Sequence, residues 1–162
     1  MGLSIRLARH DDTARLVELI HAFAEDVSET AAAVTDQVDR DAIGPDRLVE
    51  TLLAESDGRV IGFVMFQRGF LSFAATRGVY LTDLYVEPAH RRRGVGRALM
   101  AAVARQCREH GGQWVIWDVW RKNAPALAFY EQLGARPRAG LLSMWLRGAA
   151  FERLAGPGTS AP

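Results

Sequence analysis

With 162 residues, of which 49% are hydrophobic and 24% charged, the chain is long enough to bury one sizeable core and short for two ordinary domains. The longest apolar run, residues 60–66, falls far short of the ~20 residues that cross a bilayer, which excludes a membrane-spanning helix. A single cysteine, Cys107, excludes an internal disulfide framework and is predicted to lie in the core. The first residues lack the apolar core of a signal peptide, so we expect a cytoplasmic protein without a membrane partner.

Charge is distributed unevenly along the chain, although the formal net charge is only +1. Residues 25–46 contain seven acids against one base, and residues 88–108 contain six arginines and no acid. Two such segments mark either ligand-facing regions of opposite sign or ordinary solvated faces. A nucleic-acid interface would rest on the arginines alone, and the near-zero net charge argues against it.

The chain begins with a short apolar segment at residues 5–7, which predicts a strand. An amphipathic helix follows, with Asp11 and Asp12 as possible N-caps. Its apolar side chains recur at helical spacing and are Leu16, Leu19, Ile20, Phe23 and Val27. After a polar stretch, Pro45-Asp46 is typical of a helix start and predicts a second helix. The apolar side chains of that second helix would be Leu48, Leu52 and Leu53.

The middle of the chain predicts a hairpin and a further strand. Asp57-Gly58 is a turn signal, and the β-branched and aromatic run at residues 60–66 follows it as a strand. Residues 79–86 form another such run, which Pro88 stops.

The second half alternates helices and strands. A helix is predicted at residues 95–110, stopped by two glycines, and a strand at residues 113–120. A shorter helix is predicted at residues 124–133 and a final strand at residues 141–146, before a last turn of helix. The order predicts one mixed α/β sheet, with antiparallel strands first and a strand-helix-strand crossover later.

We therefore expect a single domain over residues 1–155 and a disordered tail at residues 156–162, which is rich in glycine, proline and serine.

The clearest chemical signal is Arg91-x-x-Gly94-x-Gly96, between a strand and the start of a helix. Glycines let the backbone approach a ligand, and the first turn of a helix presents N–H groups at the positive end of its dipole. The arginines add positive charge, so a pyrophosphate suits the segment. A glycine-containing helix entry on a solvated basic surface is the alternative. A Rossmann site is excluded because Leu99 stands where a third small residue is needed.

Three segments together resemble the successive motifs of the GNAT superfamily of N-acetyltransferases. They are residues 80–88 (YLTDLYVEP), 91–99 (RRRGVGRAL) and 123–135 (NAPALAFYEQLGA), and the resemblance extends over residues 5–156. Within that superfamily the chain is most similar to the diamine branch, which contains the spermidine/spermine and thialysine acetyltransferases. The resemblance implies a GNAT-like fold, with a mostly antiparallel sheet of six to seven strands, splayed central strands and about four helices.

The resemblance also implies that acetyl-CoA is the acetyl donor. Backbone groups of the strand would run beside its pantetheine arm, and the arginine and glycine loop would hold its pyrophosphate. The implied cofactor-binding residues are Leu84, Tyr85, Val86, Arg91, Arg92, Arg93, Gly94, Val95, Gly96, Arg97 and Asn123. Asn123 is also a good helix cap.

For catalysis, Tyr130 matches the tyrosine that protonates the departing CoA thiolate, with a place in the aromatic core as the alternative. The identity of the base is open, because the diamine branch commonly has glutamate where this chain has Thr82. Asp83 is one candidate; a water chain held by Thr82 and Asp83 is another, and an acid after the first helix, Glu25 or Asp26, is a third. The implied substrate-binding residues are Glu25, Asp26, Thr82, Trp117 and Asp118.

The function expected from the resemblance is acetyl transfer to a primary amine of a small molecule, such as a polyamine, a diamine or an amino acid, by direct attack on the thioester. A non-catalytic CoA-binding sensor and a transferase that uses another acyl-CoA are the alternatives. The four tryptophans form either an aromatic wall around an alkylammonium or parts of the core. The histidines lack ligand spacing, so no metal site is expected. Relatives of this branch are commonly dimers, so we expect a homodimer.

Overall fold

One mixed five-stranded sheet organises the first part of the chain, in the order β1-β2-β3-β4-β5. The computed structural model describes residues 2–156 and divides into two units, Met1–Val119 and Trp120–Pro162. The strands, all in the first unit, are β1 (Leu3–Leu7), β2 (Glu50–Ser56), β3 (Arg59–Leu71), β4 (Thr76–Val86) and β5 (Gly112–Trp117). Neighbours from β1 to β4 are antiparallel, and β5 is parallel to β4.

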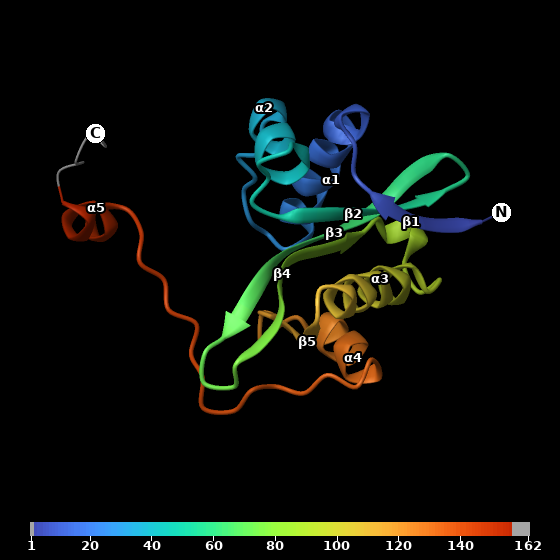
Figure 1. Ribbon diagram of the computed structural model, residues 1–162. Helices are drawn as coiled ribbons and strands as arrows, with labels where there is room; N and C mark the ends of the chain where they lie inside the picture. The colour runs from blue at the N-terminus through green and yellow to red at the C-terminus, as the bar shows by residue number, and fades with distance from the viewer. Residues whose placement is uncertain (1, 157–162) are drawn as a thin grey trace. The chain divides into compact units, whose positions relative to one another are not determined.

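Helices cover both faces of this sheet (Figure 1). On one face lie α1 (Thr13–Asp26), the short α2 (Thr35–Val38) and a π-helical turn, Asp39–Ile43. On the other lies α3 (Val95–Glu109), which is the crossover that joins β4 to the parallel β5. Two single turns of 3-10 helix, His10–Asp12 and Pro88–His90, precede α1 and follow β4. The predicted mixed α/β architecture is confirmed, whereas a sheet of six to seven strands is not found in residues 2–156.

The segment predicted as a second helix from Pro45 is instead strand β2. Leu52 pairs with Val64 and Leu53 pairs with Phe63, and all four side chains are buried. A strand covered by helices on both faces is apolar on both faces, so its sequence lacks the alternation that distinguishes a strand from a short helix. The helical turns in this region end earlier, at Ile43.

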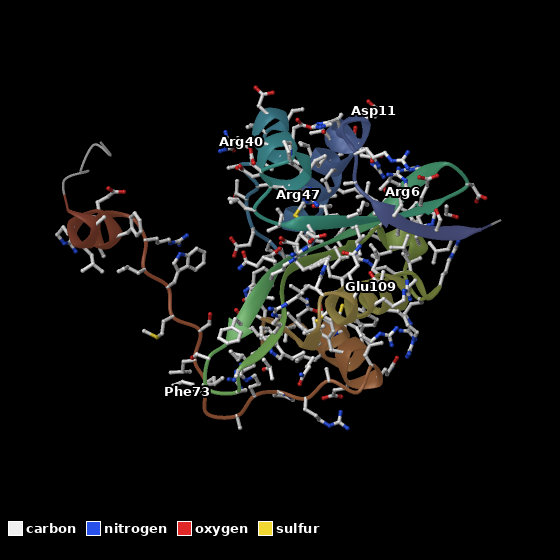
Figure 2. All side chains as sticks on the ribbon, in the orientation of Figure 1. Arg6, Asp11, Arg40, Arg47, Phe73 and Glu109 are labelled. Carbon is white, nitrogen blue, oxygen red and sulfur yellow. The ribbon has the colours of Figure 1, made fainter. Side chains whose placement is uncertain are left out.

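Turn chemistry and close packing fix the sheet at two places. Asp57 and Gly58 have φ angles of 52° and 75°, as the two central residues of the predicted hairpin turn between β2 and β3 require. At the other end of the sheet, Trp114 lies against Gly78, where an added Cβ would come within 2.1 Å of the indole. Phe73 lies in the turn between β3 and β4 and is fully exposed (Figure 2).

The second unit contains α4 (Ala124–Gln132) and α5 (Ala149–Ala155). Residues 141–146, predicted as a final strand, have no regular secondary structure here, because they pair with no other strand in the described chain. Of the predicted tail, only residue 156 is among the described residues, and residues 157–162 lie outside them. Within residues 2–156, no helix is both long enough and apolar enough to cross a bilayer.

Candidate functional site

A bulge in β4 determines which of its side chains share a face. Met65 of β3 pairs with Asp83, and the next residue, Phe66, pairs with Leu81, so Thr82 is an extra residue in β4. The hydroxyl of Thr82 donates to the carbonyl oxygen of Met65 at 3.3 Å. A residue predicted to bind substrate therefore has a structural role in shaping the strand.

Asp83 lies on the face of the sheet that α1 covers. Its partner Met65 belongs to the apolar cluster that contains Leu16 and Leu19 of α1 and Phe63 of β3. Burial raises the pKa of the Asp83 carboxyl above its ordinary value. A carboxylate with a raised pKa is a better proton acceptor than an exposed one.

A second carboxylate, that of Asp118, is held against β4 by a hydrogen bond. The hydroxyl of Tyr80 donates a hydrogen bond of 2.5 Å to Oδ2 of Asp118, the residue that follows β5. This bond, then burial and the negative charges of Asp118 and Asp83, raise the pKa of Tyr80 to about 12. Tyr80 is the one member of this group that sequence reasoning missed.

The sequence holds little signal for Tyr80, since side chains three positions apart on a regular strand face opposite ways. Only the bulge at Thr82 puts Tyr80 and Asp83 on one face.

The pairing of β4 with β5 ends within β4. The last pair joins Leu81 to Trp117, whereas β4 continues to Val86. The strand edge from Thr82 to Val86 is thus not paired with β5, and it includes the predicted cofactor-binding residues Leu84, Tyr85 and Val86. An unpaired edge of this kind can accept an extended ligand along its backbone.

The loop after β4 turns into a helix N-terminus with glycine at the turn. Gly94 is the N-cap of α3 with φ 83°, and nothing lies within 4 Å of the place where its Cβ would be. Arg92 also has a positive φ of 61°, and the side chains of Arg92, Arg93 and Arg97 are exposed. Val95, predicted to bind the cofactor, is the first residue of α3, and Gly96 is the second. The open turn, the first-turn N–H groups and the arginines fit a pyrophosphate.

The side chain of Arg91 contacts three other residues of the first unit. Its Nε donates to the carbonyl of Val86 at 2.8 Å, and a terminal nitrogen pairs with Asp26 at the end of α1 at 3.0 Å. Its guanidinium also lies over the ring of Tyr85, 5.5 Å from the centroid. Arg91 and Asp26, predicted for the cofactor and the substrate respectively, thus form one ion pair, and Glu25 beside them is exposed.

Two predicted residues belong to the second unit. The side chain of Asn123 accepts a hydrogen bond from the backbone of Ala126 at 3.1 Å, so its capping of α4 is confirmed. Tyr130 lies on α4, and the centroid of its ring is 5.1 Å from the centroid of the Phe129 ring. Burial raises the pKa of Tyr130 to about 12, which keeps its phenol protonated.

The tryptophans are divided between the two units, Trp114 and Trp117 in the first and Trp120 and Trp145 in the second. Trp114 packs on Gly69 and Gly78 and donates to Thr76 at 3.2 Å, as a core residue does. Trp117 ends β5 and is half-buried, whereas Trp145 in the second unit is 78% exposed beneath Arg147. Among residues 2–156, no three acidic, histidine or cysteine side chains come together as metal ligands would.

Comparison with known proteins finds a family match and sequence relatives. Residues 14–135 match the sequence profile of the acetyltransferase (GNAT) family. The L-ornithine N5-acetyltransferase of Arabidopsis thaliana is 38% identical over 98 residues, which are 60% of this chain and 40% of that protein. The thialysine N-epsilon-acetyltransferase of Sus scrofa is 28% identical over 164 residues, covering 94% of this chain and 96% of that protein.

Solved structures show the same fold. An integron cassette protein from the mobile metagenome of V. cholerae superposes with a TM-score of 0.82 at 22% identity, over 97% of this chain and 99% of that one. An aminoglycoside acetyltransferase from a soil metagenome superposes with a TM-score of 0.74 at 17% identity, over 90% and 97% of the two chains.

Proposed function

Because the chain belongs to the acetyltransferase (GNAT) family, we propose that it transfers the acetyl group of acetyl-CoA to a primary amine of a small molecule. The observation that carries this proposal is the course of β4. The part of β4 that is not paired with β5 starts beside the carboxylates Asp83 and Asp118. It ends at the loop that contains the arginines and glycines. Strand β4 thus has carboxylates that can bind an amine beside its unpaired edge and a loop that can bind phosphate after its end.

The residues that would hold acetyl-CoA are the β4 edge and the loop after it. Backbone groups of Leu84 and Tyr85 would accompany the pantetheine arm, and the N-terminus of α3 with Arg92, Arg93 and Arg97 would hold the pyrophosphate. Arg91 would act through its contacts to Val86 and Asp26, by keeping the loop against the strand. Asn123, the cap of α4, is proposed as a further cofactor contact.

Proton transfer follows from the pKa values of the groups involved. An alkylammonium has a pKa near ~10.4 and must lose a proton before its nitrogen can attack. Asp83 is the proposed acceptor, since its burial favours the protonated carboxyl. Acetyl-CoA, when bound, supplies the thioester carbon to which the C–N bond forms as the C–S bond breaks. Tyr130 is the proposed donor to the departing sulfur, because its buried phenol is protonated at neutral pH.

The proposed substrates are small amines that carry a second charged group. Two relatives are named for ornithine and for thialysine, both amino acids with a side-chain amine. Glu25, Asp26, Thr82, Trp117 and Asp118 remain the proposed substrate-binding residues, with Asp26 also paired to Arg91. Diamines and polyamines fit the same carboxylates.

A homodimer is also proposed. Large apolar side chains of the second unit are exposed by 50–87%, and a surface of that kind is normally covered by a partner. They are Trp120, Leu141, Leu142, Met144, Trp145, Leu146, Phe151 and Leu154. A cytoplasmic location stays a prediction from the sequence.

The experiment that tests the function measures thiol release from acetyl-CoA with ornithine, thialysine, lysine, spermidine, putrescine and aminoglycosides in turn. We expect release that depends on one class of amine. The double variant Arg92→Ala/Arg93→Ala should raise the KM for acetyl-CoA about tenfold and leave the KM for the amine unchanged. Exposed arginines interact with a phosphate mainly through their charge. Binding of acetyl-CoA without release with any amine would favour a sensor, and release only with another acyl-CoA would change the donor.

A further inference from the structure

We infer that Glu87 is a positioning residue for acetyl-CoA: its carboxylate fixes the short connection between the unpaired edge of β4 and the arginine and glycine loop, residues 91–96. It acts through the backbone that it holds in place. This inference rests on the proposed function, because it concerns the cofactor side of the same site.

The first step of the argument is the place of Glu87 in the chain. The strand edge proposed for the pantetheine arm ends at Val86, and the loop proposed for the pyrophosphate begins at Arg91. A single turn of 3-10 helix, Pro88–His90, connects them. That turn is closed on Glu87 itself, whose carbonyl oxygen accepts a hydrogen bond from the N–H of His90 at 2.9 Å. Where Glu87 lies therefore decides where the loop begins.

The second step concerns the contacts of the Glu87 carboxylate. Its Oε1 accepts hydrogen bonds from Arg15, in the first turn of α1, at 2.6 Å and from Arg59, at the start of β3, at 3.0 Å. The guanidinium of Arg15 is itself fixed, because two of its nitrogens donate to the carbonyl of Val60 at 3.0 and 3.1 Å. Only 18% of the Glu87 side chain is exposed, so solvent screens these charge-assisted bonds less than it screens those of a surface pair.

The third step is that both ends of the connection are held. The N–H of Glu87 donates to the carbonyl of Ile61 at 3.0 Å, one position beyond the last pair of β3 with β4. At the other end, Arg91 pairs with Asp26, the last residue of α1. Helix α1 thus contacts the two ends of the connection through Arg15 near its start and Asp26 at its end. A shift of either end breaks an ion pair.

The fourth step links this arrangement to the cofactor. A ligand that contacts two sites gains most when the sites have a fixed separation, because its second contact is then intramolecular. The β4 edge is held by its pairing with β3, and the loop leads into α3, so each part keeps its own structure when the connection loosens. Loss of the Glu87 charge should therefore weaken a donor that contacts both parts. A donor that contacts the β4 edge alone should be unaffected.

The test uses Glu87→Gln, which keeps the shape of the side chain and removes its charge. We expect the KM for acetyl-CoA to rise about tenfold, with kcat and the KM for the amine within about twofold, because the lost interaction is the same in the ground state and in the transition state. S-acetylpantetheine, which lacks the diphosphate, is the truncated donor. Its kcat/KM should stay within about twofold, whereas a general loss of structure would lower the kcat/KM of both donors.

Glu18→Gln is the matched control, because it makes the same change at the other carboxylate that Arg15 contacts, at 2.8 Å. Glu18 is exposed, and its substitution should leave the KM for acetyl-CoA unchanged. Arg59→Gln is a second variant, which leaves Arg15 in place and changes only an exposed side chain. It should raise the KM for acetyl-CoA about threefold, and it decides the question if Glu87→Gln does not fold.

Calorimetry of CoA binding gives a readout without turnover. Transfer by the unmodified protein, with a loss for acetyl-CoA that S-acetylpantetheine and Glu18→Gln do not share, supports the inference. Transfer with acetyl-CoA unaffected, or with equal losses for both donors, overturns the inference and leaves the proposed function intact. CoA binding without transfer, weakened about tenfold by Glu87→Gln and not by Glu18→Gln, overturns the proposed function alone. No CoA binding, or CoA binding without transfer that Glu87→Gln does not weaken, overturns both.

Discussion

The two units of this chain differ in how far their large apolar side chains are exposed to solvent. In Met1–Val119 the sheet, α1 and α3 share a buried apolar core in which Leu16, Leu53 and Phe63 are fully inaccessible, although Leu3, Leu7 and Phe70 of the sheet are exposed. In residues 120–156 neither α4 nor α5 has a fully buried residue, Tyr130 being partly buried, and Leu142, Met144 and Trp145 are exposed by 84%, 87% and 78%. Burial of apolar surface contributes roughly 25 cal/mol per Å² to the free energy of folding or association. The exposed side chains of the second unit therefore favour association with a partner.

The first unit therefore has a packed hydrophobic core of its own, whereas the second unit has large apolar side chains that remain exposed to solvent. The groups proposed to bind acetyl-CoA and amine lie mostly in the first unit, and Asn123 and Tyr130 lie in the second. We therefore expect substitutions in the first unit to change stability and binding. Substitutions in the second should change turnover and assembly.

The largest expected effect is on the packing of the first unit. Gly78→Ala should lower the free energy of unfolding by about 3 kcal/mol, because the new Cβ would lie 2.1 Å from Trp114 and the indole is held between strands. Chemical denaturation measures it. Gly140→Ala, in the second unit, meets no atom within 4 Å, so only the positive φ of 79° opposes the new side chain, and the free energy of unfolding should fall by about 1–2 kcal/mol. Equal losses would contradict the contrast.

The next effect is on turnover. Tyr130→Phe should lower kcat about 100-fold, because the departing thiolate loses its proton donor, while binding of CoA by calorimetry stays within twofold. Asp118→Asn, at a proposed substrate-binding residue of the first unit, should instead raise the KM for the amine. If Tyr130→Phe retained full kcat, its phenol would be a packing partner of Phe129 only.

Asp83 connects activity to stability. Asp83→Asn should lower kcat about 100-fold through loss of the proton acceptor. It should also raise the melting temperature at pH 7, because the folded protein holds this carboxyl with a pKa above its ordinary 3.8 and the ionised form is penalised by burial.

The sign of the pH dependence follows. Above the raised pKa the penalty is fully present, and it disappears as the pH falls through that value towards 3.8. The gain from Asp83→Asn in thermal melts should therefore shrink with acidification. A gain that grew at low pH would show that the carboxyl is stabilised in its ionised form instead.

Substitutions of the exposed apolar side chains in the second unit should have the smallest effect on the free energy of unfolding. They should change the molecular mass of the assembly in solution. Leu142→Ser/Trp145→Ser should convert a dimer into a monomer in light scattering, because both side chains belong to the exposed apolar set. The free energy of unfolding of the monomer should change by less than about 0.5 kcal/mol. Leu48→Ser, at a residue of the first unit that is 72% exposed, is the control and should not change the mass. An unmodified protein that is monomeric would remove the dimer proposal.

The sequence by itself determined the family, the crossover of β4, α3 and β5, the glycine loop at the start of α3 and the cap at Asn123. These features depend on residues close together in the chain, where turn chemistry and helix termini leave a local pattern. Tertiary structure alone decided that residues 50–56 form a strand, because cover on both faces removes the alternation of its side chains. It also decided the ion pair of Arg91 with Asp26 and the meeting of Tyr80 with Asp118. Both contacts join residues far apart in the chain, and a bulge of one residue at Thr82 sets which side chains of β4 face α1, so no local pattern could specify them.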